Sequence, residues 1–181
     1  MKKITEKRAT KKVKVISPKT KKKSLGVDVT GHRGEQWLYT ETVKDHFFHP
    51  RNIFYTEKEA QEYEKTADGI GQVGSPACGD VMRIYIKVNK KKNIITSCKF
   101  KTFGCASALA STSILTEMAI GKTLEEAKKI TPQNIVKALG GLPVRKIHCS
   151  VLGDQALRAA IEDYEKKKFW KSTKNKGKYD Y

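Results

Sequence analysis

Five side chains that bind metals well stand in three separate stretches of the sequence. They are Cys78 and Asp80 in "GSPACGDVMRIYIKV", Cys105 in "TFGCASA", and His148 and Cys149 in "KIHCSVLG". Each stretch falls where a predicted strand or helix begins or ends, so a compact fold can gather them at one edge. Soft thiolates select zinc, iron–sulfur clusters or copper(I). The sequence therefore predicts a four-coordinate metal site with one ligand to spare, although it contains no CxxC pair.

Several of these residues also have an ordinary structural explanation. Asp80 could cap a turn, and His148 could be a partly buried histidine with satisfied hydrogen bonds.

Cys105 and Cys149 stand at expected helix N-termini, where the helix dipole favours thiolate over thiol. The fourth cysteine, Cys98, falls on the apolar face of a predicted strand, so we expect it to be a small buried hydrophobe.

Two alternating stretches predict an antiparallel hairpin that would position these residues. One apolar face carries Met82, Ile84, Ile86 and Val88, and the second carries Ile94, Thr96, Cys98 and Phe100. A side-chain period of two is that of a strand, and the short "NKKKN" between the stretches leaves room only for a turn. Gly79 and Gly104 flank the hairpin and should allow close backbone approach and unusual dihedrals.

Helices are predicted on both sides of the hairpin. "TETVKDHFFHPRN" predicts a short helix with Val43, Phe47 and Phe48 turned inward, halted by Pro50, and residues 57–65 predict a surface helix or loop. After the hairpin, a helix is predicted from Ala106 to a cap at Gly121, and Thr123 with Glu126 forms a capping box that opens a short helix. Another helix is predicted from Thr131-Pro132 to Gly140-Gly141. A long helix is predicted from about Ser150, with Leu157, Ile161 and Tyr164 on one side. The fold class is therefore α+β, with helices packed on an antiparallel sheet.

The net charge of +18 is concentrated at the two ends of the chain. Residues 1–36 carry a net charge of +9 and residues 166–181 carry +6, which leaves +3 for the segment between them. We expect a Lys-rich arm (1–36), one domain (37–168) and a basic tail (169–181). The basic arm lacks aromatic residues that could stack on bases, so nucleic acid is not expected as a partner. With no secretory signal or apolar run of ~20 residues, a cytoplasmic protein without a membrane partner is expected, ahead of one in an organelle matrix.

Four motifs resemble one known family in the same order along the chain. They are "GSPACGDVMRIYIKV", "FKTFGCASALAS", "LTEMAIGKTLEEA" and "GLPVRKIHCSVLGDQALRAAIEDY". Together they are similar to the iron–sulfur cluster assembly scaffolds of the IscU type and the N-terminal domain of NifU. The resemblance implies an α+β fold with a three-stranded antiparallel sheet, in which "GIGQVG" supplies the remaining strand.

The resemblance also implies roles for individual residues. Cys78, Cys105 and Cys149 match the cysteines that hold a nascent [2Fe–2S] cluster built from iron, and Asp80 and His148 match the accompanying aspartate and histidine. Cys149 is the candidate persulfide acceptor. The implied partners are a cysteine desulfurase, an iron or electron donor, apo-protein acceptors such as ferredoxin, and an Hsp70-type chaperone with its co-chaperone. The expected chaperone contacts are Leu142, Pro143, Val144 and Lys146.

Two departures from the family pattern are visible. Ala106 replaces the usual glycine after the second cysteine, and "LPVRK" lacks the second proline of the chaperone motif. The alternative function within related proteins is a zinc-dependent sulfurtransferase of the SUF type, and zinc could occupy the isolated protein. That branch has an insertion between the second and third cysteines, which this sequence lacks. A nucleic-acid module with structural zinc and a cysteine hydrolase using Cys105 and His148 are weaker alternatives from other classes.

Overall fold

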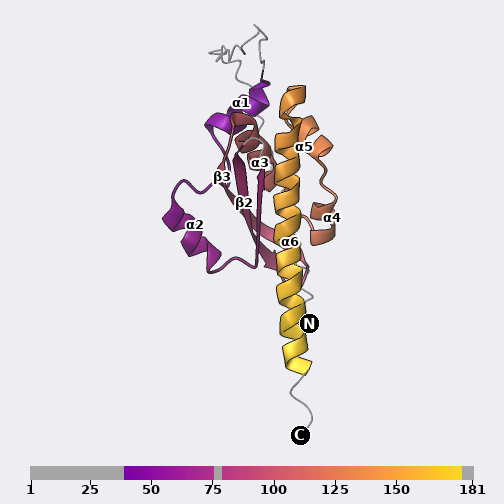
Figure 1. Cartoon of the computed structure of the whole chain (residues 1–181). Coiled ribbons are helices and arrows are strands. Elements are labelled where there is room, and N and C mark those ends of the chain that lie inside the picture. Colours follow the sequence, from indigo (N-terminus) through magenta and orange to yellow (C-terminus); the bar gives the residue numbers. More distant parts are fainter. Residues whose placement is uncertain (1–38, 76–78, 177–181) are drawn as a thin grey trace, which may run out of the picture.

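The computed structural model describes residues 39–75 and 79–176, with the backbone alone for Arg145, 148–150 and 171–176. Three strands and several helices follow one another along this part of the chain (Figure 1). In order they are α1 (Glu41–Phe48), α2 (Glu57–Glu64), β1 (Gly69–Ser75), β2 (Asp80–Asn89), β3 (Ile94–Phe103), α3 (Ala106–Ala119), α4 (Leu124–Lys128), α5 (Pro132–Ala138), the 3-10 helix η1 (Val144–Lys146) and α6 (Ile147–Lys176).

The sheet has the order β1-β2-β3 and both pairings are antiparallel. The predicted hairpin is β2 and β3, and "GIGQVG" forms most of β1, so the expected α+β fold with a three-stranded sheet is confirmed. The first residue of β2, Asp80, pairs with Ser75 at the end of β1. On the other side, Val81 pairs with Phe103, the last residue of β3. These three strand termini therefore lie side by side at one end of the sheet, which is called the sheet edge below.

A β-bulge changes the predicted alternation of β3. Val88 pairs with Ile95, whereas Lys87 pairs with Ser97, so Thr96 is an extra residue on this strand. Ile95 is fully buried, Ile94 is only half-buried and Thr96 is exposed, so placing Ile94 and Thr96 on the core face was wrong. The bulge is explained by a tertiary contact with the chain that follows α3. The Ile95 N–H donates to the Lys122 carbonyl, and the Ile95 carbonyl accepts the Gly121 N–H.

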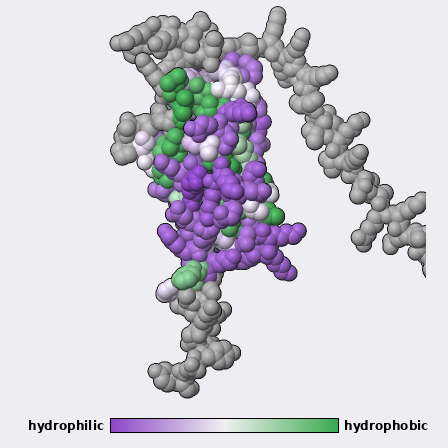
Figure 2. All heavy atoms as spheres, turned by 90° about the vertical axis from the view of Figure 1, so that its right-hand side faces the viewer, coloured by the Kyte–Doolittle hydropathy of each residue, from purple (hydrophilic) through white to green (hydrophobic). Residues whose placement is uncertain are grey.

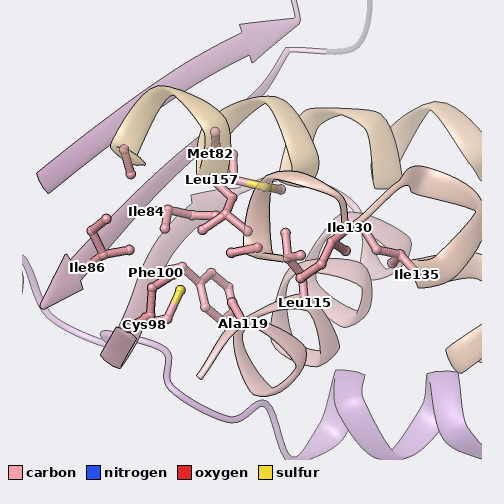
Figure 3. Close-up of a cluster of buried hydrophobic side chains, with 14 of the residues drawn as sticks. Met82, Ile84, Ile86, Cys98, Phe100, Leu115, Ala119, Ile130, Ile135 and Leu157 are labelled. Atoms are coloured by element: carbon pink, nitrogen blue, oxygen red, sulfur yellow. The ribbon is translucent and has the colours of Figure 1, made fainter. Parts of the chain in front are cut away.

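The main core lies between one face of the sheet and the helices α3 and α6 (Figure 3). Met82, Ile84 and Phe100 from the sheet meet Leu115 of α3 and Leu157 of α6, and all five are completely buried. Cys98 belongs to the same cluster with no exposed surface, which confirms the expected structural role. Burial raises the pKa of the Cys98 thiol to about 12, so the group stays protonated at neutral pH.

Helix α6 and strand β1 are packed so closely that only glycine fits between them. A Cβ atom on Gly71 would lie 2.1 Å from the Ala156 carbonyl oxygen, and one on Gly69 would lie 2.2 Å from that of Ala160. A hydrogen bond also joins the two elements, because the Ile70 N–H of β1 donates to the Asp163 carboxylate of α6 over 2.9 Å. The two glycines thus let α6 run directly along the edge strand.

A second, smaller cluster lies on the opposite face of the sheet under α2. Tyr85 is completely buried there, with its ring centroid 5.5 Å from Phe54, and Ala60 of α2 is equally buried. Tyr63 of α2 contacts Phe54 with a ring-centroid distance of 5.2 Å, and its hydroxyl donates to Ser97 over 2.7 Å. Residues 57–64 therefore form a surface helix, one of the two predicted possibilities, and part of this helix covers the sheet.

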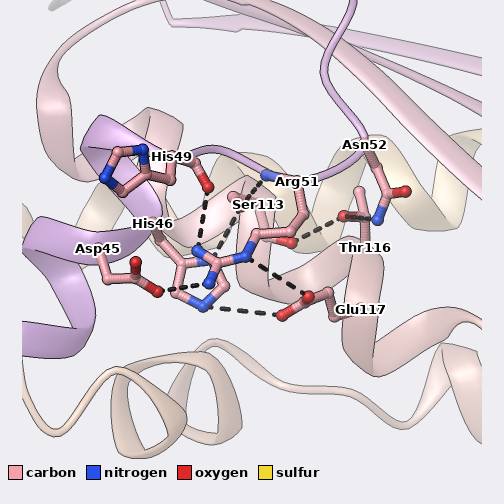
Figure 4. Close-up of polar contacts among 8 residues, drawn as sticks. All are labelled: Asp45, His46, His49, Arg51, Asn52, Ser113, Thr116 and Glu117. Carbon is pink, nitrogen blue, oxygen red and sulfur yellow. Dashed lines mark hydrogen bonds and ion pairs between the residues drawn. The ribbon is translucent and has the colours of Figure 1, made fainter. Parts of the chain in front are cut away.

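Helix α1 is held on α3 largely by polar contacts (Figure 4). Val43 is buried as predicted, but Phe47 and Phe48 are 38% and 55% exposed, so turning them inward was wrong. His46 takes the buried position instead, because its Nδ1 lies 2.8 Å from the Ser113 hydroxyl of α3. The same hydroxyl accepts the Arg51 backbone N–H over 2.9 Å, which ties down the chain that leaves α1.

The predicted helix boundaries hold for α3, α4 and α5. Thr123 and Glu126 form the expected capping box, Pro132 begins α5, and Gly121 and Gly140 follow the helices with φ values of 84° and 73°. The long last helix begins at Ile147, earlier than the expected start near Ser150, because η1 leads directly into it.

Candidate metal centre

Three connections carry the predicted site residues, and two of them meet at the sheet edge where the strands end. The chain from β1 to β2 contains Cys78, which lies outside the described residues. The chain from β3 to α3 contains Gly104 and Cys105, and the junction of η1 with α6 leads to His148 and Cys149. Asp80 is the first residue of β2, so it stands beside the end of β3 in the sheet.

Asp80 is the most buried of the placed site residues, with 5% of its surface exposed. Its carboxyl group lies against the backbone of Gly104, because a Cβ atom there would be 3.0 Å from the Asp80 Cγ and 3.1 Å from its Oδ1. Gly104 therefore provides the close approach predicted for it, while Gly79 provides the unusual dihedral, with a φ of 70°. The carboxylate and the residue before Cys105 are direct neighbours.

Cys105 is the N-cap residue of α3 and is half-buried. Its extended backbone, with φ −74° and ψ 168°, stops the strand, and its carbonyl oxygen accepts the Leu109 N–H over 3.1 Å as the first bond of the helix. The partial positive charge of the helix N-terminus stabilises an anion at this position. The predicted placement of Cys105 at a helix start is thus confirmed.

The start of α6 is anchored near this edge by a tight contact one turn after Cys149. A Cβ atom on Gly153 would lie 3.1 Å from the Leu115 side chain and 3.7 Å from the sulfur of Met82. Met82 follows Asp80 by two positions, so the first turns of α6 cross the same end of the sheet. The backbones of His148 and Cys149 lie in the first turn of α6, and their side chains are outside the described residues.

The predicted ligand set is therefore placed only in part. Among the described side chains, no three from His, Cys, Asp and Glu gather as a metal site. The side chains of Cys78, His148 and Cys149 lie outside the described residues. Asp80 lies against Gly104, the residue before Cys105, and the ligation of a metal by all five residues stays a prediction.

Exposed apolar side chains surround the same edge, and only Val144 among them was a candidate from the sequence. Phe103 is 81% exposed and Val144 is 85% exposed, and Val81 and Ile147 are about half as accessible. Hydrophobic side chains gather at the upper end of the face in Figure 2, at the height where α6 begins in Figure 1. Phe103 could have been found from the alternation of β3, which turns it away from Phe100 and the core. Such a patch is typical of a protein-binding surface.

The four residues expected to contact a chaperone differ in accessibility. Val144 is the most exposed, whereas Pro143 and Lys146 are half-buried. Leu142 is also half-buried and packs against the main core. The segment therefore presents Val144 outward and uses Leu142 to attach itself to the body.

The comparison with known families covers nearly all of the described residues. The profile of NifU-like N terminal domains matches residues 38–171. The chain belongs to this family. It is 54% identical to iron-sulfur cluster assembly scaffold protein IscU 1 of Archaeoglobus fulgidus over 130 residues, which are 72% of this chain and 78% of that relative. It is 48% identical to the IscU scaffold protein of Aquifex aeolicus over 126 residues, which are 70% and 75% of the two chains.

Other relatives extend the similarity to NifU and to mitochondrial proteins. The nitrogen fixation protein NifU of Nostoc sp. is 48% identical over 71% of this chain and 42% of that relative. The iron sulfur cluster assembly protein 1, mitochondrial, of Candida glabrata is also 48% identical, over 72% of this chain and 59% of that relative.

Solved structures support the same fold. The N-terminal part of a NifU-like protein from Brucella abortus superposes with a TM-score of 0.50 over 71% of this chain and 94% of that chain, at 19% identity. FiSufU of Fervidobacterium islandicum AW-1 gives 0.50 over 68% and 96%, at 22% identity. Within the described residues, no helix is both long enough and apolar enough to cross a membrane.

Proposed function

We propose that this chain is a scaffold on which iron–sulfur clusters are assembled before transfer to apo-proteins. The observation that carries the proposal is the buried Asp80 carboxylate packed against Gly104, next to the half-buried Cys105 at a helix N-terminus. Membership of the family and the names of its relatives support the same function. In this role the protein holds its cargo without catalysing a turnover of its own.

The cargo we propose is a [2Fe–2S] cluster held by the thiolates of Cys78, Cys105 and Cys149. Asp80 and His148 supply weaker oxygen and nitrogen donation at the fourth position. Four thiolates in a closed cage retain a cluster, as in ferredoxins. Three thiolates with an exchangeable fourth donor leave one corner at which an incoming acceptor thiolate can attack, so the chemistry of the donor set fits release as well as assembly.

Sulfur would enter through Cys149. Its thiolate attacks the terminal sulfur of a persulfide on a cysteine desulfurase, a new S–S bond forms on Cys149, and the desulfurase thiolate leaves. The bound sulfur must then gain two electrons to become sulfide, so an electron donor is a required partner. The first turn of α6 and the nearby Lys146 favour the thiolate form that this attack needs.

The partners we propose follow from these steps. A desulfurase delivers sulfur, an iron or electron donor completes the cluster, and acceptors such as apo-ferredoxin receive it. An Hsp70-type chaperone and its co-chaperone would bind the segment of Leu142, Pro143, Val144 and Lys146, in which Val144 is the exposed contact. We expect these steps in the cytoplasm, which cell fractionation would check.

The second candidate is a zinc-dependent sulfurtransferase of the SUF type, since the same thiolates would bind zinc. One experiment separates the two functions. The full chain is reconstituted anaerobically with iron, cysteine, a reductant and a cysteine desulfurase, and its visible absorption and metal content are measured. A scaffold gains iron and sulfide in equal amounts with a cluster spectrum. A protein that keeps one zinc and gains only persulfide is the sulfurtransferase, and the proposal is then wrong.

A further inference from the structure

The far end of α6 exposes two large aromatic side chains. Phe169 is 72% exposed and Trp170 is 63% exposed, and the three residues before them are exposed as well. In Figure 1 this part of α6 extends past the end of the sheet. Adjacent exposed aromatic residues cannot be explained by the core, and they are uncommon on a surface that meets only water.

Helix geometry places this pair on the side of α6 that faces away from the body. Tyr164 marks the inward side, because it is 4% exposed and belongs to the main core. Counting about 100° per residue from Tyr164, Phe169 and Trp170 lie about 140° to one side and about 120° to the other. Lys166 lies between them, nearly opposite Tyr164 and one turn earlier. The outward face thus presents one lysine followed by two aromatic rings.

The sequence of α6 from Lys166 onward is basic. From Lys166 to Lys176, the end of α6, there are six lysines and no acidic residue. Two of these lysines already have partners: Lys167 donates to Asp163 within α6 over 2.6 Å, and Lys168 donates to Asn93 on the body over 3.3 Å. The Lys168 contact ties the inner side of α6 to the turn that precedes β3.

We propose that the end of α6 binds an anionic membrane surface peripherally, through Lys166, Phe169 and Trp170. Aromatic rings partition into the bilayer interface, and lysine stems reach from there to lipid phosphates. Clustered lysines add electrostatic attraction to anionic lipids. A bilayer interface also adapts to a convex helix, whereas single-stranded nucleic acid needs a groove in which bases can stack. Peripheral binding requires no membrane-spanning run, and it departs from the sequence-based expectation of no membrane partner.

The proposed surface is well separated from the candidate metal centre. Cys149 lies in the first turn of α6 and Phe169 lies twenty residues later, which corresponds to about 30 Å along the helix. A membrane-bound molecule would therefore leave the metal centre accessible to protein partners. The inference does not depend on the proposed cluster chemistry.

The test measures binding of the full chain to lipid vesicles by co-flotation. The vesicles are phosphatidylcholine alone or with about 30% phosphatidylserine. We expect at least about tenfold tighter binding to the anionic vesicles and a marked loss at about 0.5 M salt. The chain has two tryptophans, so a Trp37→Phe background lets the emission of Trp170 report insertion by a blue shift.

Matched variants decide whether the end of α6 is responsible for vesicle binding. Phe169→Ser with Trp170→Ser should weaken binding to anionic vesicles at least about tenfold, without changing thermal unfolding, because both side chains are exposed. Tyr55→Ser, which removes an aromatic residue that is 74% exposed elsewhere, should have no effect. Equal binding by the double variant, or equal affinity for neutral and anionic vesicles, overturns the proposal. Binding of a uridine oligonucleotide that requires the same two aromatic residues, without vesicle binding, also overturns it.

Discussion

Two cysteines seven positions apart have opposite surroundings. Cys98 is completely buried in β3, where desolvation holds its pKa near 12 and keeps it a thiol. Cys105 is half-buried at the start of α3, where the helix N-terminus stabilises an anion. Sulfur chemistry is therefore expected at Cys105 and excluded at Cys98 for an electrostatic reason, although both belong to the same strand-to-helix segment.

The first prediction compares cysteine replacements. Single changes of Cys78, Cys105 or Cys149 to Ser should reduce cluster absorbance after anaerobic reconstitution to less than about a tenth, because serine oxygen is a poor ligand for the cluster. Cys98→Ala is the control and should retain the cluster while lowering the free energy of unfolding by about 1 kcal/mol. A Cys98 variant that loses the cluster as the others do would show that the assigned ligands are wrong.

The second prediction concerns release of the cluster. Asp80→Ala should still assemble a cluster but transfer it to apo-ferredoxin several-fold more slowly, because the exchangeable oxygen donor is gone. Transfer is followed by circular dichroism. Asp68→Ala, which removes a carboxylate that accepts the Val88 N–H elsewhere on the sheet, should transfer at the wild-type rate. Equal or faster transfer by the Asp80 variant would leave that residue a structural role only.

At the scale of elements, the close contact of β1 with α6 controls stability. Gly71 meets the α6 backbone with no room for a side chain, whereas a Cβ atom on Gly74 would have its nearest neighbour at 3.7 Å. The two glycines belong to the same strand, so they form a matched pair of positions in which only the space differs.

The third prediction uses this pair. Gly71→Ala should lower the free energy of unfolding by about 3 kcal/mol or more, because backbone atoms of α6 must move. Gly74→Ala should change it by less than about 0.5 kcal/mol, since ordinary van der Waals contact is available. Urea denaturation measures both. Similar values for the two variants would mean that β1 and α6 do not lie this close in solution.

The contact of α1 with α3 gives the fourth prediction, on pH dependence. Burial and then the nearby Arg51 charge lower the pKa of His46 below 6.5, against the opposing effect of Glu117 and Asp45. Below about pH 6.5 the unfolded state therefore binds more protons than the folded state, so stability falls as the pH drops toward the folded pKa. His46→Gln should lose less stability than the wild type between about pH 7.5 and about pH 5.5.

Urea unfolding at several pH values checks this difference. His49→Gln is the control, because it removes an exposed imidazole at the end of the same helix and keeps the buried one in place. If the stability of the His46 variant falls with pH as steeply as that of the wild type, the buried imidazole is not the group that causes the pH dependence.

At the scale of the whole molecule, the described chain is organised around a sheet whose one end carries the candidate metal centre. The fifth prediction tests whether the first 36 residues are needed. Their deletion should leave thermal unfolding and cluster assembly unchanged, because the family match begins at residue 38, while the net charge falls from +18 to +9. A truncated chain that unfolds or cannot be reconstituted would show that the arm belongs to the domain.

Much of this arrangement could be predicted from the sequence, because the signals are local. The alternation in β2, the capping box at Thr123 and the glycine after α3 each depend on neighbouring residues alone. The bulge at Thr96 could not be predicted, since it depends on hydrogen bonds between Ile95 and a distant loop. His46 replaces Phe47 inside for the same kind of reason, as its partner Ser113 lies in another helix.

The candidate site shows the same division. The positions of Asp80 and Cys105 at element ends followed from periodicity, and their proximity follows from the register of β2 with β3. The packing of the Asp80 carboxyl on Gly104 required the structure, because it depends on how the chain turns from β3 into α3, whereas the outward direction of Phe103 follows from the alternation of β3.

The packing of β1 on α6 also determines the order in which the protein can fold during synthesis. Gly71 leaves the ribosome well before its partner Ala156, which lies 85 residues later in the sequence. Until then the apolar face of the nascent sheet has no α6 to cover it. Contacts between such distant segments form slowly, and uncovered sheet surfaces promote aggregation. We therefore expect cotranslational folding of this chain to finish only after α6 is complete, with the sheet dependent on cellular holdases until that moment.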